Sequence, residues 1–387
     1  MNPKVTGITP TVLQWARETR GYSVEQVAIR LNRDVDEIIS WESGESTPTY
    51  PQLERLAYQI YKRPLAVFFL PQPPDEPDPK RQFRTLPDFE LDNLSVDTRY
   101  HLRLAQVYQL SLKELNDGIN PAARKIFRDI SLSVTDDVPT ASERVREYIG
   151  VPLNVQLEWR DTDEALKAWR IAVEDTGIFV FKNAFKQKEI SGFCLLDDNF
   201  PVIYLNNSTG KTRQIFSLFH ELGHILLGVF GITKFDKTYI NHLQDREKRI
   251  ERFCNAFAAE VLIPSTDFDR QVKHIDRESE ELVINLADRY RVSREAILRR
   301  LLDRGMVSRE LYLEKAIAWA DQSTEKKSGG DYYANRATYL GDRYLQLVFK
   351  QHYQGKLSPE QVAEYLGIKT GSIPGLEEYA LRKAVPE

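Results

Sequence analysis

Cysteine is almost absent from this chain of 387 residues, which contains only Cys194 and Cys254. Two cysteines cannot form a disulfide framework, and their wide separation matches no paired-cysteine metal motif. Long hydrophobic runs are also absent, since no apolar stretch approaches the roughly eighteen residues of a membrane-spanning helix. The first residues lack a basic start followed by an apolar segment. We therefore expect a soluble, cytoplasmic protein that makes no membrane contact.

An excess of positive charge is missing as well. The chain has 53 lysines and arginines against 57 aspartates and glutamates, a formal net charge of -4. This balance provides no overall attraction for nucleic acid, so a DNA contact would need a local basic patch. What the chain does have is length and 42% hydrophobic residues, enough for a sizeable core and two or three domains.

Changes in pattern along the chain predict four parts and an α+β fold class. Residues 1–70 have apolar residues at helical spacing and predict an all-helical domain. Residues 71–140 begin with five prolines in nine residues (71–79) and predict a stiff linker and a helical connector. Residues 141–305 combine helices with three β-rich runs, and residues 306–387 predict a helical C-terminal unit. The three β-rich runs are GIFVFK, ISGFCLL and PVIYLN.

The apolar residues of the first domain recur on one face of each expected helix. Ser23 and Gln26 are spaced for a capping box at the start of the second helix. The three apolar sets contain Val12, Leu13 and Ala16, then Val24, Val27, Ala28 and Leu31, and then Val35, Ile38, Ile39 and Trp41.

The stretch FSLFHELGHILLG, residues 216–228, is an apolar run that contains two histidines and a glutamate. Its spacing predicts a buried helix that starts near Ser208 or Thr209 and stops at Gly228. The two histidines could bind a metal ion, or they could be ordinary core residues with backbone partners. The second explanation is weaker, because burying three ionisable groups together without a shared purpose costs free energy.

His220 and His224 are four residues apart and therefore lie on one helix face, where both imidazoles can bind one metal ion. Glu221 lies about 100° round the helix, a direction suited to a general base acting on a metal-bound water. Gly223 between them indicates a close neighbour, which could be a strand, the substrate or simple packing. The expected cofactor is one divalent ion, Zn²⁺ first and Mn²⁺ or Fe²⁺ as alternatives.

A catalytic metal site needs a third protein ligand and an open fourth position. Glu251 and Asn255 are four apart on an expected helix, so Glu251 can bind the metal while Asn255 steadies a ligand histidine. Spacing alone leaves the choice of third ligand open. The downstream candidates are His242, Asp245, Glu247, Glu251 and Glu260.

HELGH followed by the pattern E-x-x-x-N-x-F-A-A-E-x-L-x-P resembles the ImmA/IrrE family of metallopeptidases, over roughly residues 140–305. The resemblance implies a zincin-like domain with a small β-sheet, in which His220, His224 and Glu251 bind the metal. It also implies that Glu221 is the general base. The sequence departs from the family at Cys254, where alanine is usual, and a thiol there could become an accidental ligand.

Two features of such a site stay open at this point. In zincin-like enzymes an edge strand beside the metal binds the substrate backbone, and residues 189–196 or 200–205 are the candidates here. An oxyanion-stabilising group is not identified, although Tyr290, His274 and Arg294 are available.

The N-terminal segment resembles the helix-turn-helix domains of phage repressors (the XRE type), on the stretch LQWARETRGYSVEQVAIRLNRDVDEIISWESGESTPT. Such a domain lays its third helix in the DNA major groove. Residues 33–45, however, contain one basic residue, Arg33, against five acidic ones. Arg17, Arg20 and Arg30 could still reach the phosphate backbone. DNA binding through residues 10–70 and a protein-docking or dimerising use of the fold therefore both stay open.

Three functional hypotheses follow. The first is a metallo-endopeptidase that cuts a repressor or another regulatory protein in a stress or mobile-element response, as the resemblance implies. The second is a non-catalytic transcriptional regulator or antitoxin that uses the peptidase fold as a sensor or a toxin-binding platform. The third is a metal-dependent hydrolase of a substrate other than a peptide. No chemistry is assigned to residues 306–387.

Overall fold

The computed structural model of the chain describes residues 3–75, 94–185, 190–234, 243–273, 280–322 and 330–384. The chain divides into two compact units, Met1–Arg103 (unit 1) and Leu104–Glu387 (unit 2). The described residues are mostly helical and contain one four-stranded sheet, so the predicted mixed α+β class is confirmed. The domain limits at residues 70, 140 and 305 stay predictions, and the proline-rich segment 71–79 lies partly outside the described residues.

Unit 1 is a small bundle of short helices. Gly21 has a left-handed φ of +82° and ends the first helix, and Ser23 and Gln26 form the predicted capping box of the second. In the third apolar set, Ile38 is buried, whereas Ile39 is 49% exposed. The helices are α1 (Pro10–Arg20), α2 (Val24–Leu31), α3 (Val35–Ser43) and α4 (Tyr50–Glu54), which continues as a π-helix (Arg55–Tyr61) before a 3₁₀ turn (Leu65–Phe69).

The sheet of unit 2 contains the three predicted β-rich runs and one strand that the sequence did not indicate. The strands are β1 (Phe179–Asn183), β2 (Ile190–Leu195), β3 (Val202–Asn206) and β4 (Ile232–Lys234), in the order β1-β3-β2-β4. β3 is parallel to β1, and β2 is antiparallel to both β3 and β4. Every residue of β2 and β3 is buried, which explains their almost continuous apolar sequence.

This order corrects the expectation for the substrate-binding edge. Segments 189–196 and 200–205 correspond to β2 and β3, and each of these strands has a paired neighbour on both sides. Among the described strands, β1 and β4 lie at the two ends of the sheet. The sequence did not predict β4, because a strand of three residues shows too little alternation of apolar and polar residues.

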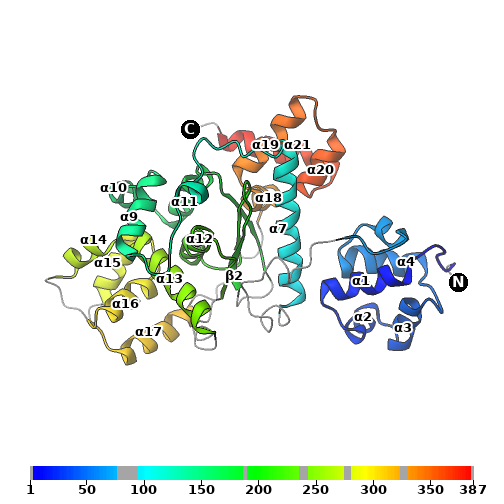
Figure 1. Cartoon of the computed structure of the whole chain (residues 1–387), viewed down its shortest axis with the longest axis horizontal. Helices are drawn as coiled ribbons and strands as arrows, with labels where there is room; N and C mark the ends of the chain where they lie inside the picture. The colour runs from blue at the N-terminus through cyan, green and yellow to red at the C-terminus, as the bar shows by residue number, and fades with distance from the viewer. Residues whose placement is uncertain are drawn as a thin grey trace. The chain divides into compact units, whose positions relative to one another are not determined.

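Helices cover the sheet and form most of the core of unit 2 (Figure 1). Helix α12 (Lys211–Leu226) packs against β2 and β3 and contacts α11 (Thr162–Glu174) and α13 (Asp245–Leu262). The other helices between residues 96 and 322 are α7 (Val96–Leu115), α8 (Ile126–Asp129), α9 (Val138–Tyr148), α10 (Leu153–Glu158), α14 (Ser265–Gln271), α15 (Glu280–Tyr290), α16 (Arg294–Asp303) and α17 (Arg309–Gln322).

The last four helices pack on the β1 side of unit 2. The ring of Tyr344 contacts Phe181 of β1 edge-on, with ring centres 5.2 Å apart. Arg170 of α11 forms a largely buried ion pair with Glu174 and donates to the carbonyl oxygen of Thr338 at 2.8 Å. The C-terminal segment therefore shares contacts with the sheet and α11. The helices are α18 (Tyr332–Leu340), α19 (Asp342–Tyr353), α20 (Pro359–Leu366) and α21 (Ile373–Ala384).

Candidate metal centre

Helix α12 carries both histidines and is buried along most of its length. His220 and His224 are each 1% exposed and Glu221 is 0% exposed. The helix begins after Gly210 rather than at the expected Ser208 or Thr209, because Asn206 holds those two residues in a turn after β3. It ends at Leu226. The apolar residues that bury it include Ile215, Leu218, Phe219, Leu222, Ile225 and Leu226.

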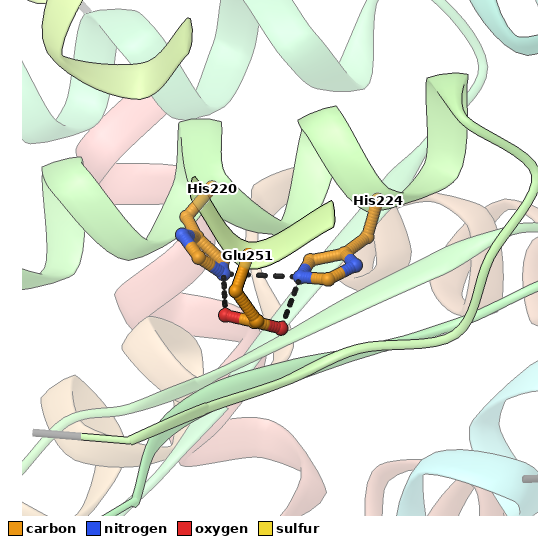
Figure 2. A group of neighbouring side chains, drawn as sticks. All are labelled: His220, His224 and Glu251. Atoms are coloured by element: carbon orange, nitrogen blue, oxygen red, sulfur yellow. Dashed lines mark hydrogen bonds and ion pairs between the residues drawn. The ribbon is translucent and has the colours of Figure 1, made fainter. Parts of the chain in front are cut away.

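Three donor atoms converge beside α12 (Figure 2). The Nε2 atoms of His220 and His224 lie 3.0 Å apart. The Glu251 carboxylate reaches both rings, with Oε2 at 3.3 Å from His220 Nε2 and Oε1 at 3.2 Å from His224 Nε2. In the part of the chain that the structure describes, these residues form the one group of three metal-binding side chains at such short range. The predicted candidates His220, His224 and Glu251 thus meet at one point.

The donor set and its spacing fit a small divalent ion. Metal bonds of about 2.0–2.2 Å in a tetrahedral site place neighbouring donors about 3.3–3.6 Å apart. The observed separations of 3.0 to 3.3 Å need only a small outward adjustment to reach that range. Two imidazoles and one carboxylate also leave a fourth tetrahedral position for water or substrate. The identity of the ion stays a prediction.

Glu251 reaches the site because α12 and α13 pack closely at Gly223. A Cβ atom at Gly223 would lie 3.2 Å from Phe257 Cδ1 and 3.3 Å from Cys254 Sγ, so a larger residue would push the helices apart. Of the three neighbours considered for Gly223, the structure therefore has helix packing. The close contact places Glu251, one turn before Cys254, opposite the two histidines.

The other candidates for the third ligand do not join this group. The Glu260 carboxylate accepts the backbone N–H of Ser265 at 2.7 Å and an Arg300 N–H at 2.6 Å, so it caps α14 and forms an ion pair. Asp245 is exposed in the first turn of α13, and Glu247 lies outside the donor cluster. His242 lies outside the described residues.

Asn255 lies where the sequence predicts. Its Oδ1 atom is 3.1 Å from Nδ1 of His220. An imidazole whose Nε2 binds a metal carries its proton on Nδ1, and that N–H then donates to the Asn255 oxygen. The contact therefore selects the tautomer that a metal ligand requires.

Glu221 is not one of the three converging donors, but it is fully buried on the same helix as the two histidines. Burial raises the pKa of the Cys194 thiol, and the charge of Glu221 and a hydrogen bond with its carboxylate raise it further. Cys194 belongs to β2, so Glu221 lies between α12 and the sheet. The function of Glu221 as general base stays a prediction.

Gly231 is a site residue that the sequence reasoning missed. A Cβ atom there would lie within 2.4 to 2.6 Å of the His224 ring atoms, so the backbone before β4 packs directly on the imidazole. Only glycine permits this approach. A glycine before a short β-branched run, GITK, was the available signal.

The ionisable groups of the cluster shift one another's pKa. Burial lowers the pKa of His224, but its interactions with Cys254 and Glu251 outweigh burial and raise it well above the usual value. Burial raises the pKa of Glu251, but His224 and His220 outweigh burial and lower it well below the usual range. Without a metal, the cluster therefore favours a protonated imidazole beside an ionised carboxylate.

The oxyanion candidates do not form described contacts with the cluster. The Tyr290 hydroxyl donates to Asp267 at 2.7 Å, and the Arg294 guanidinium lies over the Trp319 ring. His274 lies outside the described residues. The oxyanion-stabilising group stays unassigned.

Comparison with known proteins agrees with the earlier resemblance over part of the chain. Residues 173–302 match the model of a peptidase family described as the IrrE N-terminal-like domain. This segment contains His220, Glu221, His224, Glu251 and Asn255, together with the whole sheet. No curated protein matches the chain. Among the described helices, none combines the length and apolar character needed to cross a membrane.

Proposed function

We propose, from the family match and the donor geometry, that the chain is a metal-dependent peptidase whose centre is formed by His220, His224 and Glu251. The observation that carries the proposal is the convergence of three buried donor atoms within 4.8 Å of one another. Three ionisable groups buried together without a ligand would cost free energy. Their position inside the segment matching a peptidase family favours hydrolysis as their purpose.

The residues of the centre divide the work of hydrolysis. When bound, a divalent cation supplies Lewis acidity, which polarises a carbonyl oxygen and acidifies a water molecule. His220 and His224 offer Nε2 to the cation, and Asn255 holds the proton of His220 on Nδ1. The Glu221 carboxylate accepts a proton as water attacks the peptide carbon and then donates it to the leaving amine.

The end strand β4 suits a peptide substrate. It begins directly after Gly231, which packs on His224, and it passes the three ligand side chains (Figure 2). It pairs with β2 on one side and has no second partner among the described strands. An extended substrate that adds to this edge would place its backbone beside the centre. A peptide therefore fits better than a small molecule held in a closed pocket.

The substrate we propose is a repressor or another regulatory protein, because that is the function that the family resemblance implies. The decisive experiment incubates the zinc-loaded chain with each protein encoded beside it and follows cleavage by mass spectrometry. Cleavage by the wild-type chain, and none by Glu221→Gln, supports the peptidase. Stable binding of a toxin encoded beside the chain, with no cleavage by the wild type or by Glu221→Gln, would favour the regulator or antitoxin hypothesis.

We further propose that unit 1 has helix-turn-helix topology and holds a protein partner rather than DNA. Three arginines considered for phosphate contact are engaged inside the unit. Arg17 is paired with Glu42, Arg20 is buried and donates to the carbonyl oxygen of Val96, and Arg30 lies over the Tyr22 ring. The first turn of α3 contains Asp36 and Glu37, and its last turn contains no basic residue. A helix of this charge approaches DNA unfavourably.

A DNA titration tests the use of unit 1. Fluorescence anisotropy with a labelled duplex should detect no tight, salt-dependent binding. Few phosphates would be neutralised by unit 1, so binding should not weaken steeply as salt is added. Tight binding with a strong salt dependence would contradict this proposal and leave the peptidase proposal unaffected.

A further inference from the structure

Two side chains precede His220 along the metal-binding face of α12. Arg213 and Phe216 lie seven and four residues before His220, and these intervals place all three on one side of the helix. Figure 2 shows the imidazoles of His220 and His224 projecting from α12 toward the same point. Arg213 and Phe216 therefore continue the face that carries the metal ligands, and we call these two residues the α12 extension.

Phe216 differs in burial from the other apolar side chains of α12. Each of the others is at most 5% exposed, whereas Phe216 packs against the hydrophobic core and is only partly buried. The centre of its ring lies 6.3 Å from the centre of the His220 ring, and the two rings are tilted by 36°. An apolar surface thus remains accessible directly beside a residue of the metal centre.

Arg213 is fixed over this aromatic ring. Its guanidinium carbon lies 5.6 Å from the centre of the Phe216 ring, within the range of a cation–π interaction. Its Nε–H donates to the hydroxyl of Ser191 at 2.9 Å, and Ser191 is fully buried in β2. The register between β2 and β4 shifts between Ile190 and Gly192, on either side of this serine. Such irregularities redirect side chains beside active sites, and this one accompanies a serine that anchors Arg213.

The end strand β4 leads from the metal ligands toward the α12 extension. It begins beside the His224 ring, on which Gly231 packs, and its last residue, Lys234, pairs with Ile190 of β2. The next residue of β2 is the one that anchors the α12 extension. A peptide that adds to the open edge of β4 therefore passes the metal centre and the α12 extension in turn.

The distance between the two rings limits which substrate residue reaches Phe216. An extended chain advances about 3.3 Å per residue. The 6.3 Å between the His220 and Phe216 ring centres thus corresponds to about two residues. A substrate side chain that contacts Phe216 belongs to a residue close to the bond at the metal.

We propose that the α12 extension is a specificity subsite that selects a large apolar side chain, above all an aromatic one, within two residues of the cleaved bond. The proposal rests on the peptidase function proposed above and names the class of substrate residue that this peptidase prefers. Phe216 supplies the contact surface, and Arg213 keeps its ring in place. An aromatic substrate residue gains most, because aromatic pairs are favourable beyond the area that they bury.

Cleavage of a synthetic peptide library by the zinc-loaded full chain tests the proposal, with mass spectrometry locating each cut bond. The wild type should cut where phenylalanine, tyrosine, leucine or methionine lies at one fixed position within two residues of the bond. The cut bond in any cleaved protein should follow the same rule. Phe216→Ala should reduce the preference for phenylalanine over alanine at that position, measured as kcat/KM, by about 10- to 100-fold.

Phe219→Leu is the matched control for Phe216→Leu. Phe219 lies three residues further along the same helix, but it is 0% exposed and its ring meets Trp169 edge-on at 4.7 Å. Phe216→Leu should lower the preference for aromatic over aliphatic side chains, whereas Phe219→Leu should keep the wild-type preference. Thermal unfolding and the zinc content of each variant separate a folding or metal defect from altered specificity.

Binding without cleavage gives a second measurement. In a Glu221→Gln background, a labelled hexapeptide that contains phenylalanine should bind about tenfold more tightly than its alanine counterpart, because an aromatic side chain is buried. Adding Phe216→Ala should remove that difference. Fluorescence anisotropy measures both affinities.

The outcomes separate this proposal from the one on which it rests. A wild-type chain that holds Zn²⁺ but cuts neither the library nor any protein encoded beside it would reject the peptidase function. Cleavage with the same preference in Phe216→Ala and the wild type would reject only the subsite. A preference for aspartate or glutamate at the selected position would also reject it, since the charge of Arg213 would then decide specificity.

Discussion

Buried charges are used differently in the two units of the chain. In unit 1, Arg17 meets Glu42 through two N–H groups at 2.8 and 2.9 Å, a closed pair with side chains 12% and 10% exposed. In unit 2, the donor atoms of His220, His224 and Glu251 instead converge on one point. In a closed pair, each charged group already has its partner, whereas converging donors leave room for a further charge. The comparison separates residues that maintain a fold from residues that form a site.

The largest expected effect comes from removing one converging donor. The wild-type chain should hold about one metal ion per chain, and His220→Ala should hold none, because two protein donors bind a divalent ion far more weakly than three. Peptidase activity should disappear with the metal. Elemental analysis after dialysis measures the metal content.

His352→Ala is the control for this change. His352 lies in α19, with its ring 2.8 Å from the carbonyl oxygen of Leu357, and has no described contact with the donor cluster. It should keep the metal. Equal metal content in His220→Ala and the wild type would contradict the ligand assignment.

Removal of the proposed base should separate metal binding from chemistry. Glu221→Gln should keep the wild-type metal content, since Glu221 is outside the donor group. Its kcat should fall by about 10²- to 10⁴-fold, the usual contribution of a positioned general base. Single-turnover cleavage of the substrate protein gives the rate. A kcat within a factor of two of the wild type would remove Glu221 from the mechanism.

The parts of the centre that were predictable are those that follow from helical periodicity. The four-residue intervals of His220 to His224 and Glu251 to Asn255 each specify one helix face. The pairing of the two helices is not local. Spacing to Asn255 favoured Glu251 over Glu247 without settling the choice, and the family resemblance added the rest; the structure then brings Glu251 to the histidines.

The parts that were missed depend on contacts between segments. β4 has only three residues and exists because it pairs with β2, so its own sequence carries little signal. Gly231 is required by the nearness of the His224 ring, which no local pattern reveals. In unit 1, Ile38 and Ile39 belong to the same apolar set, yet α3 buries Ile38 and leaves Ile39 49% exposed. Periodicity therefore predicts helices better than their exact orientation.

Breaking the closed pair of unit 1 should affect stability alone. Arg17→Ala leaves Glu42 largely buried without its partner and should destabilise unit 1 by about 3 kcal/mol. The double variant Arg17→Met, Glu42→Leu removes both charges and should recover most of that loss. Hydrogen exchange of the α1–α3 amides in the full chain measures the effect. Metal content should not change, and a lower metal content would contradict the separation of the two uses of charge.

The smallest effect is the pH dependence of the converging donors. The raised pKa of His224 stabilises the metal-free fold below the usual histidine pKa of about 6.5, and this contribution is lost as pH rises through the raised value. The lowered pKa of Glu251 stabilises the fold above about pH 4.3, and that contribution is lost as pH falls. A metal must displace the His224 proton, so Zn²⁺ affinity should rise by about tenfold per pH unit from pH 6 until the imidazole is neutral. Chelator competition between pH 6 and 9 measures it. Affinity that stays constant from pH 6 to 8 would show that His224 is already neutral without the metal and that the converging donors do not share a proton.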